Sequence, residues 1–288
     1  MQSVILGCGD IGRRIVNALI DQGHDSTNIV GFVKSIQSIE RCADLGVIGL
    51  RFDLDSLTRD LSACHGAQLY YTVAPQKSGI EDLRTKSVLE QFESNDILPK
   101  RVVVISTTGV YGDCQGEWVT ESNEPNPETE RGQRRLDSEL QWFAWGKKVG
   151  VPVIILRVPG IYAKSRLPRE RIAARTPVVD PSECGYTNRI HADDLALICV
   201  AAMRRGKSGD VFNATDGTPG KISEYLQEAA KSLGEDPLPE ISFSEGQAQL
   251  SSGMMSYLGE SRKISNEKVL QQLSVDLRYP DFREGMKH

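Results

Sequence analysis

The sequence predicts an α/β fold, in which a doubly wound, mostly parallel sheet carries helices on both faces and a small C-terminal lobe follows. Short apolar runs rich in Val and Ile recur from residue 3 to residue 214, with little alternation of polar and apolar positions. Strands of that kind are usually buried on both faces. Helical patterns lie between most of the runs, and strand alternating with helix indicates a parallel sheet. A glycine pattern directly after the first run is a third indication.

The expected elements follow from these runs in chain order. The expected strands are SVILG, NIVGFV, VIGLRF, QLYYTVA, RVVVIST, VPVIILRV and DVFNA. After the first strand, Ile11, Ile15, Ala18 and Leu19 share one helical face, and Gly23 ends that helix. Further helices are expected over 131–148, 193–205 and 222–233. We therefore expect a sheet domain formed by 1–162 and 190–215, and a smaller lobe formed by 163–189 and 216–288.

Composition argues against several classes of protein. The 288-residue chain has 34 basic and 39 acidic residues, a net charge of −5, so it has no basic excess to attract nucleic acid or a membrane surface. No apolar run approaches the ~20 residues that span a bilayer. The six cysteines form no C-x-x-C pair and the four histidines lack metal-ligand spacing, so we expect free thiols and no metal. The first strand begins close to Met1, which leaves no room for a leader peptide, and we expect a cytoplasmic protein.

Gly7, Gly9 and Gly12 form the pattern G-x-G-x-x-G between an apolar strand and an amphipathic helix. In that context one glycine makes a tight turn, one lets a pyrophosphate approach the backbone, and one lets the helix pack on the strand. The N-terminus of the helix then offers N–H groups to the phosphates. The pattern predicts dinucleotide binding; the alternative is a strand–helix turn that is glycine-rich by chance.

The end of the second strand bears on the choice of dinucleotide. NAD-binding sites place an acid there, on the ribose 2′-hydroxyl, whereas NADP-binding sites place a basic group. Here the strand ends in Lys34 and Ser35, and Arg13 follows Gly12. Because an ammonium attracts a 2′-phosphate, we predict NADP rather than NAD. The alternative is that Lys34 is a solvated charge at the strand end.

Several motifs along the chain resemble those of the extended short-chain dehydrogenase/reductases, which include the NAD-dependent epimerases and dehydratases of nucleotide sugars. The stretch VVVISTTGVYGDCQGEWVTE resembles that group's fifth strand and active-site loop. FDLDS and TVAP before it, and LRVPGIY and TNRIHADDLA after it, also match. The resemblance covers nearly the whole chain and implies a Rossmann sheet of the extended short-chain dehydrogenase type.

The resemblance also implies a set of site residues. Contacts with the pyrophosphate, adenine, riboses and nicotinamide are implied for Gly7, Gly9, Asp10, Ile11, Gly12, Asp53, Leu54, Ala74, Pro75, Ser106, Pro159 and Ile161. Thr107 aligns with the hydroxyl that hydrogen-bonds the reacting oxygen, and Tyr111 belongs to the V-Y-G turn beside it. The sheet domain would thus hold the cofactor and the smaller lobe the substrate.

The expected active site departs from the group's pattern at its proton donor. The group uses a Tyr followed four residues later by a Lys, but no Tyr occurs between 112 and 161 in this chain. Arg131 stands at the Tyr position and Arg135 at the Lys position. Arginine stays protonated and cannot give up the proton. Arg135 could still hydrogen-bond a ribose, and Arg131 could bind a carboxylate, a phosphate or a developing oxyanion; the alternative is a solvated, charged helix face.

Other side chains near these motifs complete the expected pocket. Tyr162, Arg166 and Arg189 are expected to bind substrate. Arg157, Arg166 and Arg189 make the pocket cationic, which suits a small anionic or nucleotide-sugar-like substrate. The alternative is that these are ordinary surface arginines. The residues that could replace the missing proton donor are Tyr111, Tyr162 and His191.

Two functions remain open on the sequence alone. The first is an NADP-dependent oxidoreductase or epimerase with a rearranged proton donor, and the second is a non-catalytic NADP-binding module that senses cofactor state. The helix over 131–148 and the residue after it carry a wide apolar arc made of Leu136, Leu140, Trp142, Phe143, Trp145 and Val149. That width indicates either a homodimer interface or a large core within one chain.

Overall fold

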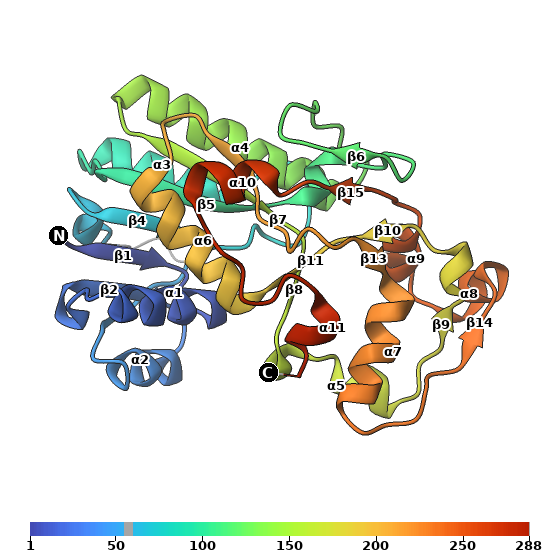
Figure 1. Cartoon of the computed structure of the whole chain (residues 1–288). Coiled ribbons are helices and arrows are strands. Elements are labelled where there is room, and N and C mark those ends of the chain that lie inside the picture. Colours follow the sequence, from blue (N-terminus) through green and yellow to red (C-terminus); the bar gives the residue numbers. More distant parts are fainter. Residues whose placement is uncertain (55–59, 288) are drawn as a thin grey trace.

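The computed structural model describes residues 1–54 and 60–287, so the end of the FDLDS stretch lies outside the described residues. Within them, a seven-stranded sheet forms the centre of the molecule (Figure 1). Every neighbouring pair of its strands is parallel. The spatial order is β12 (Val211–Asn213), β7 (Val153–Val158), β5 (Arg101–Thr107), β4 (Gln68–Tyr71), β1 (Ser3–Leu6), β2 (Ile29–Val33) and β3 (Ile48–Arg51). The predicted doubly wound α/β fold is confirmed.

Helices cover both faces of this sheet. On one face lie α1 (Asp10–Asp21), α2 (Ile36–Ala43) and α6 (Ala192–Arg205), and on the other α3 (Leu83–Ser94) and α4 (Glu130–Val149) (Figure 1). Successive side chains of a strand point to opposite faces. In β1, Ile5 packs in the core under α1 and α6, whereas Val4 and Leu6 pack in the core under α3 and α4. Both faces of the strand are buried, which explains why the run has no polar alternation.

Packing within the chain accounts for most of the apolar width of α4. Trp142 and Trp145 are buried, with ring centroids 6.3 and 5.6 Å from that of Phe92 in α3. Phe143 packs at the edge of the same core. Leu140 is 59% exposed. Most of the arc that indicated either an interface or a core therefore belongs to the core of one chain.

The smaller lobe lies beyond the carboxyl ends of the sheet strands (Figure 1, right). Its short strands pair as β8 (Gly160–Tyr162) with β11 (Arg189–His191), β9 (Val178–Val179) with β14 (Glu240–Ile241), and β10 (Tyr186–Thr187) with β13 (Gly220–Lys221). Its helices are α5 (Arg169–Ala173), α7 (Ile222–Ser232), α8 (Phe243–Gln249), α9 (Ser252–Leu258) and α11 (Phe282–Gly285). A separate apolar core that includes Tyr162, Tyr225 and Phe282 packs these elements together.

Part of the C-terminal segment leaves this lobe and covers the sheet. The strand β15 (Lys263–Ile264) pairs in parallel with β6 (Trp118–Val119), which follows β5. The helix α10 (Glu267–Leu273) packs on α6 and β12, and its Val269 and Leu273 are buried in the core of the sheet domain. Residues 267–273, expected in the smaller lobe, thus pack on the sheet domain through the apolar face of α10. The division of the chain into 1–162 with 190–215 and 163–189 with 216–288 stays a prediction.

The part of the chain that the structure describes contains neither a membrane-spanning helix nor a cluster of metal-binding side chains. No helix there has both the length and the apolar character needed to cross a membrane. Nor does any group of three or more His, Cys, Asp or Glu side chains there have an arrangement that could hold a metal ion. All six cysteines are free thiols.

Candidate functional site

The glycine pattern forms the tight connection between β1 and α1. Gly7 has a φ of +95°, which residues with a Cβ rarely adopt, and its N–H donates to the Phe32 carbonyl at 3.2 Å. A Cβ on Gly12 would lie 2.9 Å from Ile5 Cγ2, so the absence of one lets α1 approach β1. Gly9 is the N-cap of α1 and has no side chain with which to cap it. The first N–H groups of α1 therefore remain for an outside acceptor, as in an anion site.

A cavity of about 330 Å³ opens beside this loop. It is lined at the ends of β1, β2 and β4 and after β3 by Gly7, Cys8, Gly9, Phe32, Val33, Lys34, Ser38, Phe52, Asp53, Leu54, Thr72, Val73, Ala74 and Arg84. A Cβ on Gly9 would meet only the Gly7 carbonyl oxygen within 4 Å, at 3.8 Å, so it would enter space that is otherwise open. Apolar walls beside an uncapped helix N-terminus suit an adenosine and a pyrophosphate. These residues therefore fit a nicotinamide dinucleotide.

The two residues expected near the adenosine pair with each other. Lys34 Nζ lies 3.2 Å from Asp53 Oδ1, and the Lys34 side chain is 67% exposed. The loop after β4 is held at the same cavity, because Arg84 Nη1 donates to the carbonyls of Ala74 and Pro75 at 3.0 and 3.5 Å. The Lys34 ammonium thus stands at the cavity rim with a carboxylate beside it.

Arg166, expected in the substrate pocket, reaches the glycine loop instead. Its Nη1 donates to Asp10 Oδ2 at 2.8 Å, and Asp10 also pairs with Arg14 at 3.5 Å. Burial raises the pKa of Asp10, but the hydrogen bond from Arg166 and the two guanidinium charges outweigh burial and hold that pKa below its usual value. Arg166 therefore links the smaller lobe to the N-terminus of α1. Arg166 lines neither of two cavities that lie on the substrate side.

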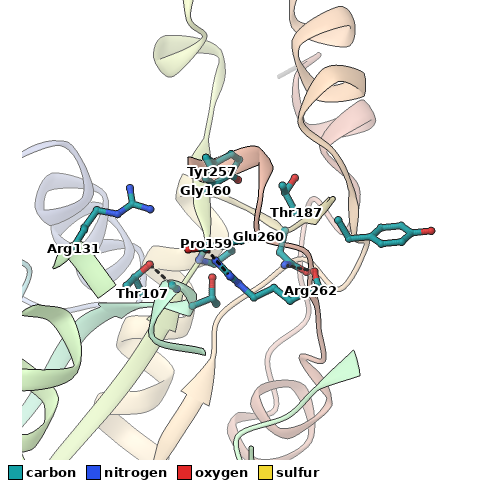
Figure 2. Close-up of a pocket in the computed structure, with 12 residues that line it drawn as sticks. Thr107, Arg131, Pro159, Gly160, Thr187, Tyr257, Glu260 and Arg262 are labelled. Atoms are coloured by element: carbon teal, nitrogen blue, oxygen red, sulfur yellow. Dashed lines mark hydrogen bonds and ion pairs between the residues drawn. The ribbon is translucent and has the colours of Figure 1, made fainter. Parts of the chain in front are cut away.

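Those two adjoining cavities lie between the ends of β5 and β7 and the smaller lobe (Figure 2). They enclose about 120 and 380 Å³ and have Arg131, Gly160 and Tyr257 as common walls. The smaller one is also lined by Thr107, Thr108, Gly109, Pro159, Tyr186, Thr187, Asn188, Glu260 and Arg262. The larger one is also lined by Ile161, Arg189, Ile222, Tyr225, Gly253 and Met254. The structure therefore brings the expected residues Thr107, Arg131 and Pro159 together.

Thr107 and Arg131 supply this space with a donor and a charge. Thr107 ends β5, and its Oγ1 accepts a hydrogen bond from the Gly109 N–H at 3.1 Å, which leaves the hydroxyl hydrogen for a ligand. Arg131 lies in the first turn of α4, and its side chain extends toward Gly160 and Tyr257 (Figure 2). Over residues 1–54 and 60–287, no carboxylate forms an ion pair with the Arg131 guanidinium.

Arg189 and Tyr257 form a pair of which the sequence indicated only the arginine. Arg189 Nη1 donates to the Tyr257 hydroxyl at 2.8 Å and to the Asn188 carbonyl at 2.9 Å. Burial raises the pKa of Tyr257, but the charge and hydrogen bond of Arg189 outweigh burial, with smaller contributions from Thr187 and Arg262. The pKa of this phenol therefore lies below its usual value.

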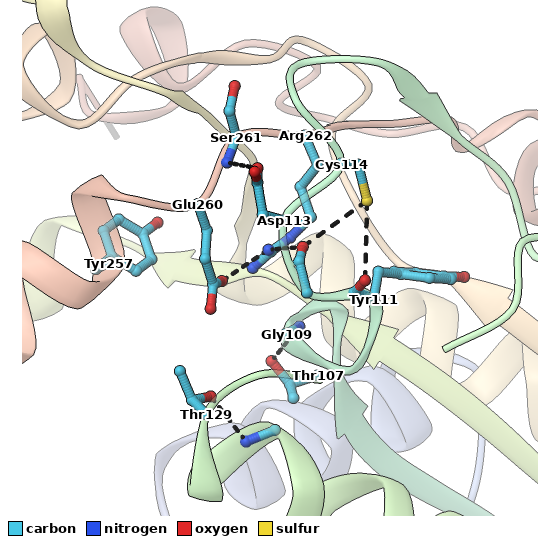
Figure 3. Close-up of polar contacts among 12 residues, drawn as sticks. Thr107, Gly109, Tyr111, Asp113, Cys114, Thr129, Tyr257, Glu260, Ser261 and Arg262 are labelled. Carbon is cyan, nitrogen blue, oxygen red and sulfur yellow. Dashed lines mark hydrogen bonds and ion pairs between the residues drawn. The ribbon is translucent and has the colours of Figure 1, made fainter. Parts of the chain in front are cut away.

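Tyr257 begins a segment that contacts the loop after β5 (Figure 3). Arg262 Nη1 donates to the Glu260 carboxylate at 2.7 Å. Asp113 Oδ1, in the loop after β5, accepts from the Ser261 N–H at 2.8 Å. The pairing of β15 with β6 continues this contact. Sequence reasoning missed Tyr257, Glu260 and Arg262, because the segment has no motif and only its tertiary contacts bring it to the site.

Ser106 and Tyr111 lie in a buried network next to the cavity. The Ser106 hydroxyl donates to the Glu139 carboxylate, which also accepts from Arg157 Nε and Nη2, both to Oε2, at 3.2 and 2.8 Å. The Arg157 guanidinium lies 4.8 Å from the centre of the Tyr111 ring, and the Tyr111 hydroxyl donates to Asn213 Oδ1 at 2.8 Å. Burial raises the pKa of Tyr111, and its ring points away from the cavity (Figure 3). This geometry suits support of the loop rather than proton transfer.

Three further expected residues are engaged in the fold. Arg135 Nη1 donates at 3.1 Å to one carbonyl after β4 and to one in β5, and burial lowers its pKa. Tyr162 is buried in the core of the smaller lobe, where its ring centroid lies 5.2 Å from that of His191, and burial raises its pKa. His191 is the N-cap of α6, and its Nδ1 accepts from the Asp193 N–H at 3.2 Å. None of the three lines the two substrate-side cavities.

The chain is similar to known proteins along nearly its whole length. The family model described as NAD dependent epimerase/dehydratase family matches residues 4–215. Protein YeeZ of Escherichia coli is 24% identical over 281 residues, which cover 96% of each chain. The structure of a functionally unknown conserved protein from Silicibacter pomeroyi has a TM-score of 0.84 at 27% identity, covering 99% of this chain and 96% of that one. The UDP-glucuronic acid 4-epimerase from Bacillus cereus, in complex with NAD, has a TM-score of 0.75 at 20% identity, covering 100% and 96%.

Proposed function

The chain belongs to the NAD dependent epimerase/dehydratase family, and on that premise we propose that it is an NAD(P)-dependent enzyme acting on a small, anionic, sugar-like substrate. The observation that carries the proposal is the Arg131 guanidinium, which faces a cavity without an ion-pair partner among the described residues. The Thr107 hydroxyl lines the same cavity. A charge for binding thus lies beside a hydrogen-bond donor for the reacting group.

The residues that would hold the dinucleotide lie along the carboxyl ends of the central strands. Gly7, Gly9 and the first turn of α1 would bind the pyrophosphate, and Asp53 would lie beside the adenosine. Pro159, which lines the substrate-side cavity, would lie beside the nicotinamide. When bound, the nicotinamide would donate a hydride to the substrate or accept one from it.

NADP is our preferred form of the cofactor. The Lys34 ammonium stands at the cavity rim and would attract a 2′-phosphate, whereas Asp53, 3.2 Å from it, offsets part of that attraction. The preference for NADP over NAD depends on whether the Lys34 ammonium or the Asp53 carboxylate lies closer to the 2′ position of the adenosine ribose. Because Lys34 is mostly exposed, we expect the discrimination to be modest.

Arg131 is the reason for proposing an anionic substrate. A guanidinium presents N–H donors in a planar fork that matches a carboxylate or a phosphate. Arg189 and Arg262 also line these cavities, but Tyr257 and Glu260 engage them. The Bacillus cereus epimerase acts on UDP-glucuronic acid, a nucleotide sugar with an anionic sugar ring, and this supports a substrate of that class here.

Thr107 would bind the oxygen that reacts. Its Oγ1 accepts from the Gly109 N–H, which fixes the hydroxyl at the end of β5. The remaining hydrogen can then donate to a hydroxyl or carbonyl oxygen placed next to Pro159 and Gly160, which line the same cavity.

Cofactor binding and turnover should be measured separately. Calorimetric titration with NADPH and NADH tests the dinucleotide site alone. Turnover is then followed by nicotinamide absorbance and by chromatography of the sugar, across nucleotide sugars, uronic acids, sugar phosphates and neutral sugars. We expect turnover of an anionic compound and none of its neutral analogue. Cofactor binding without turnover of any compound would contradict the enzymatic assignment.

The Arg131→Gln variant tests the substrate class. A charge-assisted hydrogen bond is worth about 1.5–3 kcal/mol, so KM for the anionic substrate should rise about ten- to hundredfold while cofactor affinity is unchanged. Arg131→Lys should restore part of the affinity, because it keeps the charge but loses the fork. The matched control is Lys148→Gln, at the other end of α4, where the side chain is 65% exposed and pairs with Glu93. An unchanged KM in Arg131→Gln would refute the role of Arg131.

A further inference from the structure

Oxidation or reduction at this site requires a group that exchanges a proton with the reacting oxygen. Arg131 stays protonated and cannot do so. The Glu260 carboxylate is held in an ion pair with Arg262 at 2.7 Å. Tyr111 donates its hydroxyl to Asn213 and points away from the cavity. Two phenols line the cavity with Thr107. The Tyr186 ring packs against the Lys221 ammonium, 3.7 Å from the ring centre, whereas the Tyr257 hydroxyl is engaged by the Arg189 guanidinium, so Tyr257 is the stronger candidate.

The position of Tyr257 matches that requirement. It comes from α9, on the opposite lobe from Thr107, and is a wall of both substrate-side cavities. Figure 3 shows the Glu260 carboxylate directed into the space between Tyr257 and Thr107. The Tyr257 hydroxyl accepts a hydrogen bond from Arg189 Nη1 at 2.8 Å and also has a hydrogen bond with the Thr187 side chain. The arginine is fixed in turn, because its guanidinium packs 4.4 Å from the centre of the Tyr225 ring.

We propose that Tyr257 is the catalytic residue that gives a proton to, and takes one from, the substrate oxygen bound at Thr107, an inference that rests on the proposed function. In the reducing direction, a nicotinamide held beside Pro159 would supply the hydride that adds to the carbonyl carbon. The O–H bond of Tyr257 breaks, a new O–H bond forms on the substrate oxygen, and the electron pair stays on the phenolate beside Arg189. The oxidising direction reverses each of these changes.

The charges around Tyr257 favour the phenolate. The side chains that surround Tyr257 come from four elements and from the segment after α9. They are Arg189 in β11, Thr187 in β10, Tyr225 in α7, Arg131 in α4, and Glu260 and Arg262 after α9. Three of these side chains are cations and one is an anion. The net effect of Arg189, Thr187 and Arg262 outweighs burial and brings the pKa of Tyr257 below the usual value of about 10. A proton donor works best when its pKa approaches the working pH.

The first test needs neither cofactor nor substrate. Burial raises the pKa of Tyr70, Tyr71, Tyr111, Tyr162 and Tyr225. A pH titration of tyrosinate absorbance should therefore show an early component, a tyrosine that ionises at a lower pH than these buried ones. Tyr257→Phe should remove that component. The matched control is Tyr70→Phe, which removes a phenolic hydroxyl from the core of the sheet domain and should leave the early component in place. If the early component is missing from the native protein or survives in Tyr257→Phe, the inference is overturned.

The second test measures turnover. Tyr257→Phe should lower kcat by about a hundredfold to ten-thousandfold, with NADPH and NADH affinities unchanged. Reduction by the native enzyme needs the phenol, so its rate should fall as pH rises through the pKa of Tyr257. Oxidation needs the phenolate, so its rate should rise over the same interval. The variant should lose this pH dependence.

The two proposals fail in different ways. If neither dinucleotide binds, or none of the compounds is turned over, the proposed function fails. If cofactor binding and turnover are normal in Tyr257→Phe with the native pH profile, the proposed function stands and the role of Tyr257 is refuted.

Discussion

The buried pair of Arg157 and Glu139 should dominate the effect of mutations near the site on stability. Their side chains are 6% and 2% exposed, and three N–O contacts of 2.8 to 3.3 Å join them. Glu139→Met removes the carboxylate at similar volume and leaves the guanidinium buried without its counter-charge. The contact of Arg157 with the Tyr111 ring remains but does not neutralise it.

Removal of one partner of a buried ion pair costs about 3–5 kcal/mol. Each kcal/mol shifts the midpoint of thermal unfolding by roughly 2–4 °C in a domain of this general size. We therefore expect Glu139→Met to unfold roughly 6–20 °C below the native protein. That loss is a large part of a typical stability of about 5–15 kcal/mol.

The assay is a double-mutant cycle in chemical denaturation, with calorimetry as a second measurement. Arg157→Met should also destabilise, because among the described residues it leaves the buried Glu139 carboxylate with the Ser106 hydroxyl as its remaining hydrogen-bond donor. The double variant should be more stable than the sum of the two single losses predicts, because it buries no unpaired charge. The reasoning would be refuted if either single variant lost less than about 1 kcal/mol of unfolding free energy. It would also be refuted if the loss in the double variant equalled the sum of the two single losses.

Two further predictions concern the dinucleotide cavity and are measured by calorimetric titration of NADPH and NADH. The native protein should prefer NADPH a few-fold, on the scale of an exposed ion pair, and Lys34→Asp should reverse the preference by placing a second carboxylate beside Asp53; equal native affinities would remove the argument. Gly9→Val should abolish binding of both dinucleotides with little loss of stability, because the new side chain enters open space at the N-terminus of α1; native affinity in this variant would place the phosphates elsewhere.

The sheet could be predicted from the sequence because its strands are local, apolar and separated by helices with a clear period. β3 shows the limit of that reasoning. Its run was expected to be buried on both faces, but Ile48 is 48% exposed and Leu50 is 37% exposed. β3 is the edge strand of the sheet, so it has a neighbour on one side only. An edge position is a property of the strand order, which the composition of the run does not carry.

The arginines show why the site was harder to predict. In the sequence Arg131, Arg157, Arg166 and Arg189 are equivalent cations near expected pocket motifs. In the structure Arg166 pairs with Asp10, Arg157 is buried with Glu139, and Arg189 holds a phenol. Their partners are 18 to 156 positions away, so no local pattern distinguishes them. Of these four, only Arg131 lines the cavities with neither an ion pair nor a hydrogen bond from its guanidinium in the described chain.

The backbone of the site also constrains Tyr257 through Gly160, which stands between Pro159 and Ile161, two residues expected beside the cofactor. Gly160 in the LRVPGIY motif is the parallel partner of Arg189 in the pairing of β8 with β11. A Cβ on Gly160 would lie 2.5 Å from Arg189 Nη1, the nitrogen that donates to the Tyr257 hydroxyl. The glycine therefore leaves the space in which the guanidinium crosses the strand. A glycine of the LRVPGIY motif thus leaves room for the guanidinium that donates to the phenol, and a side chain at this position would displace the charge next to Tyr257.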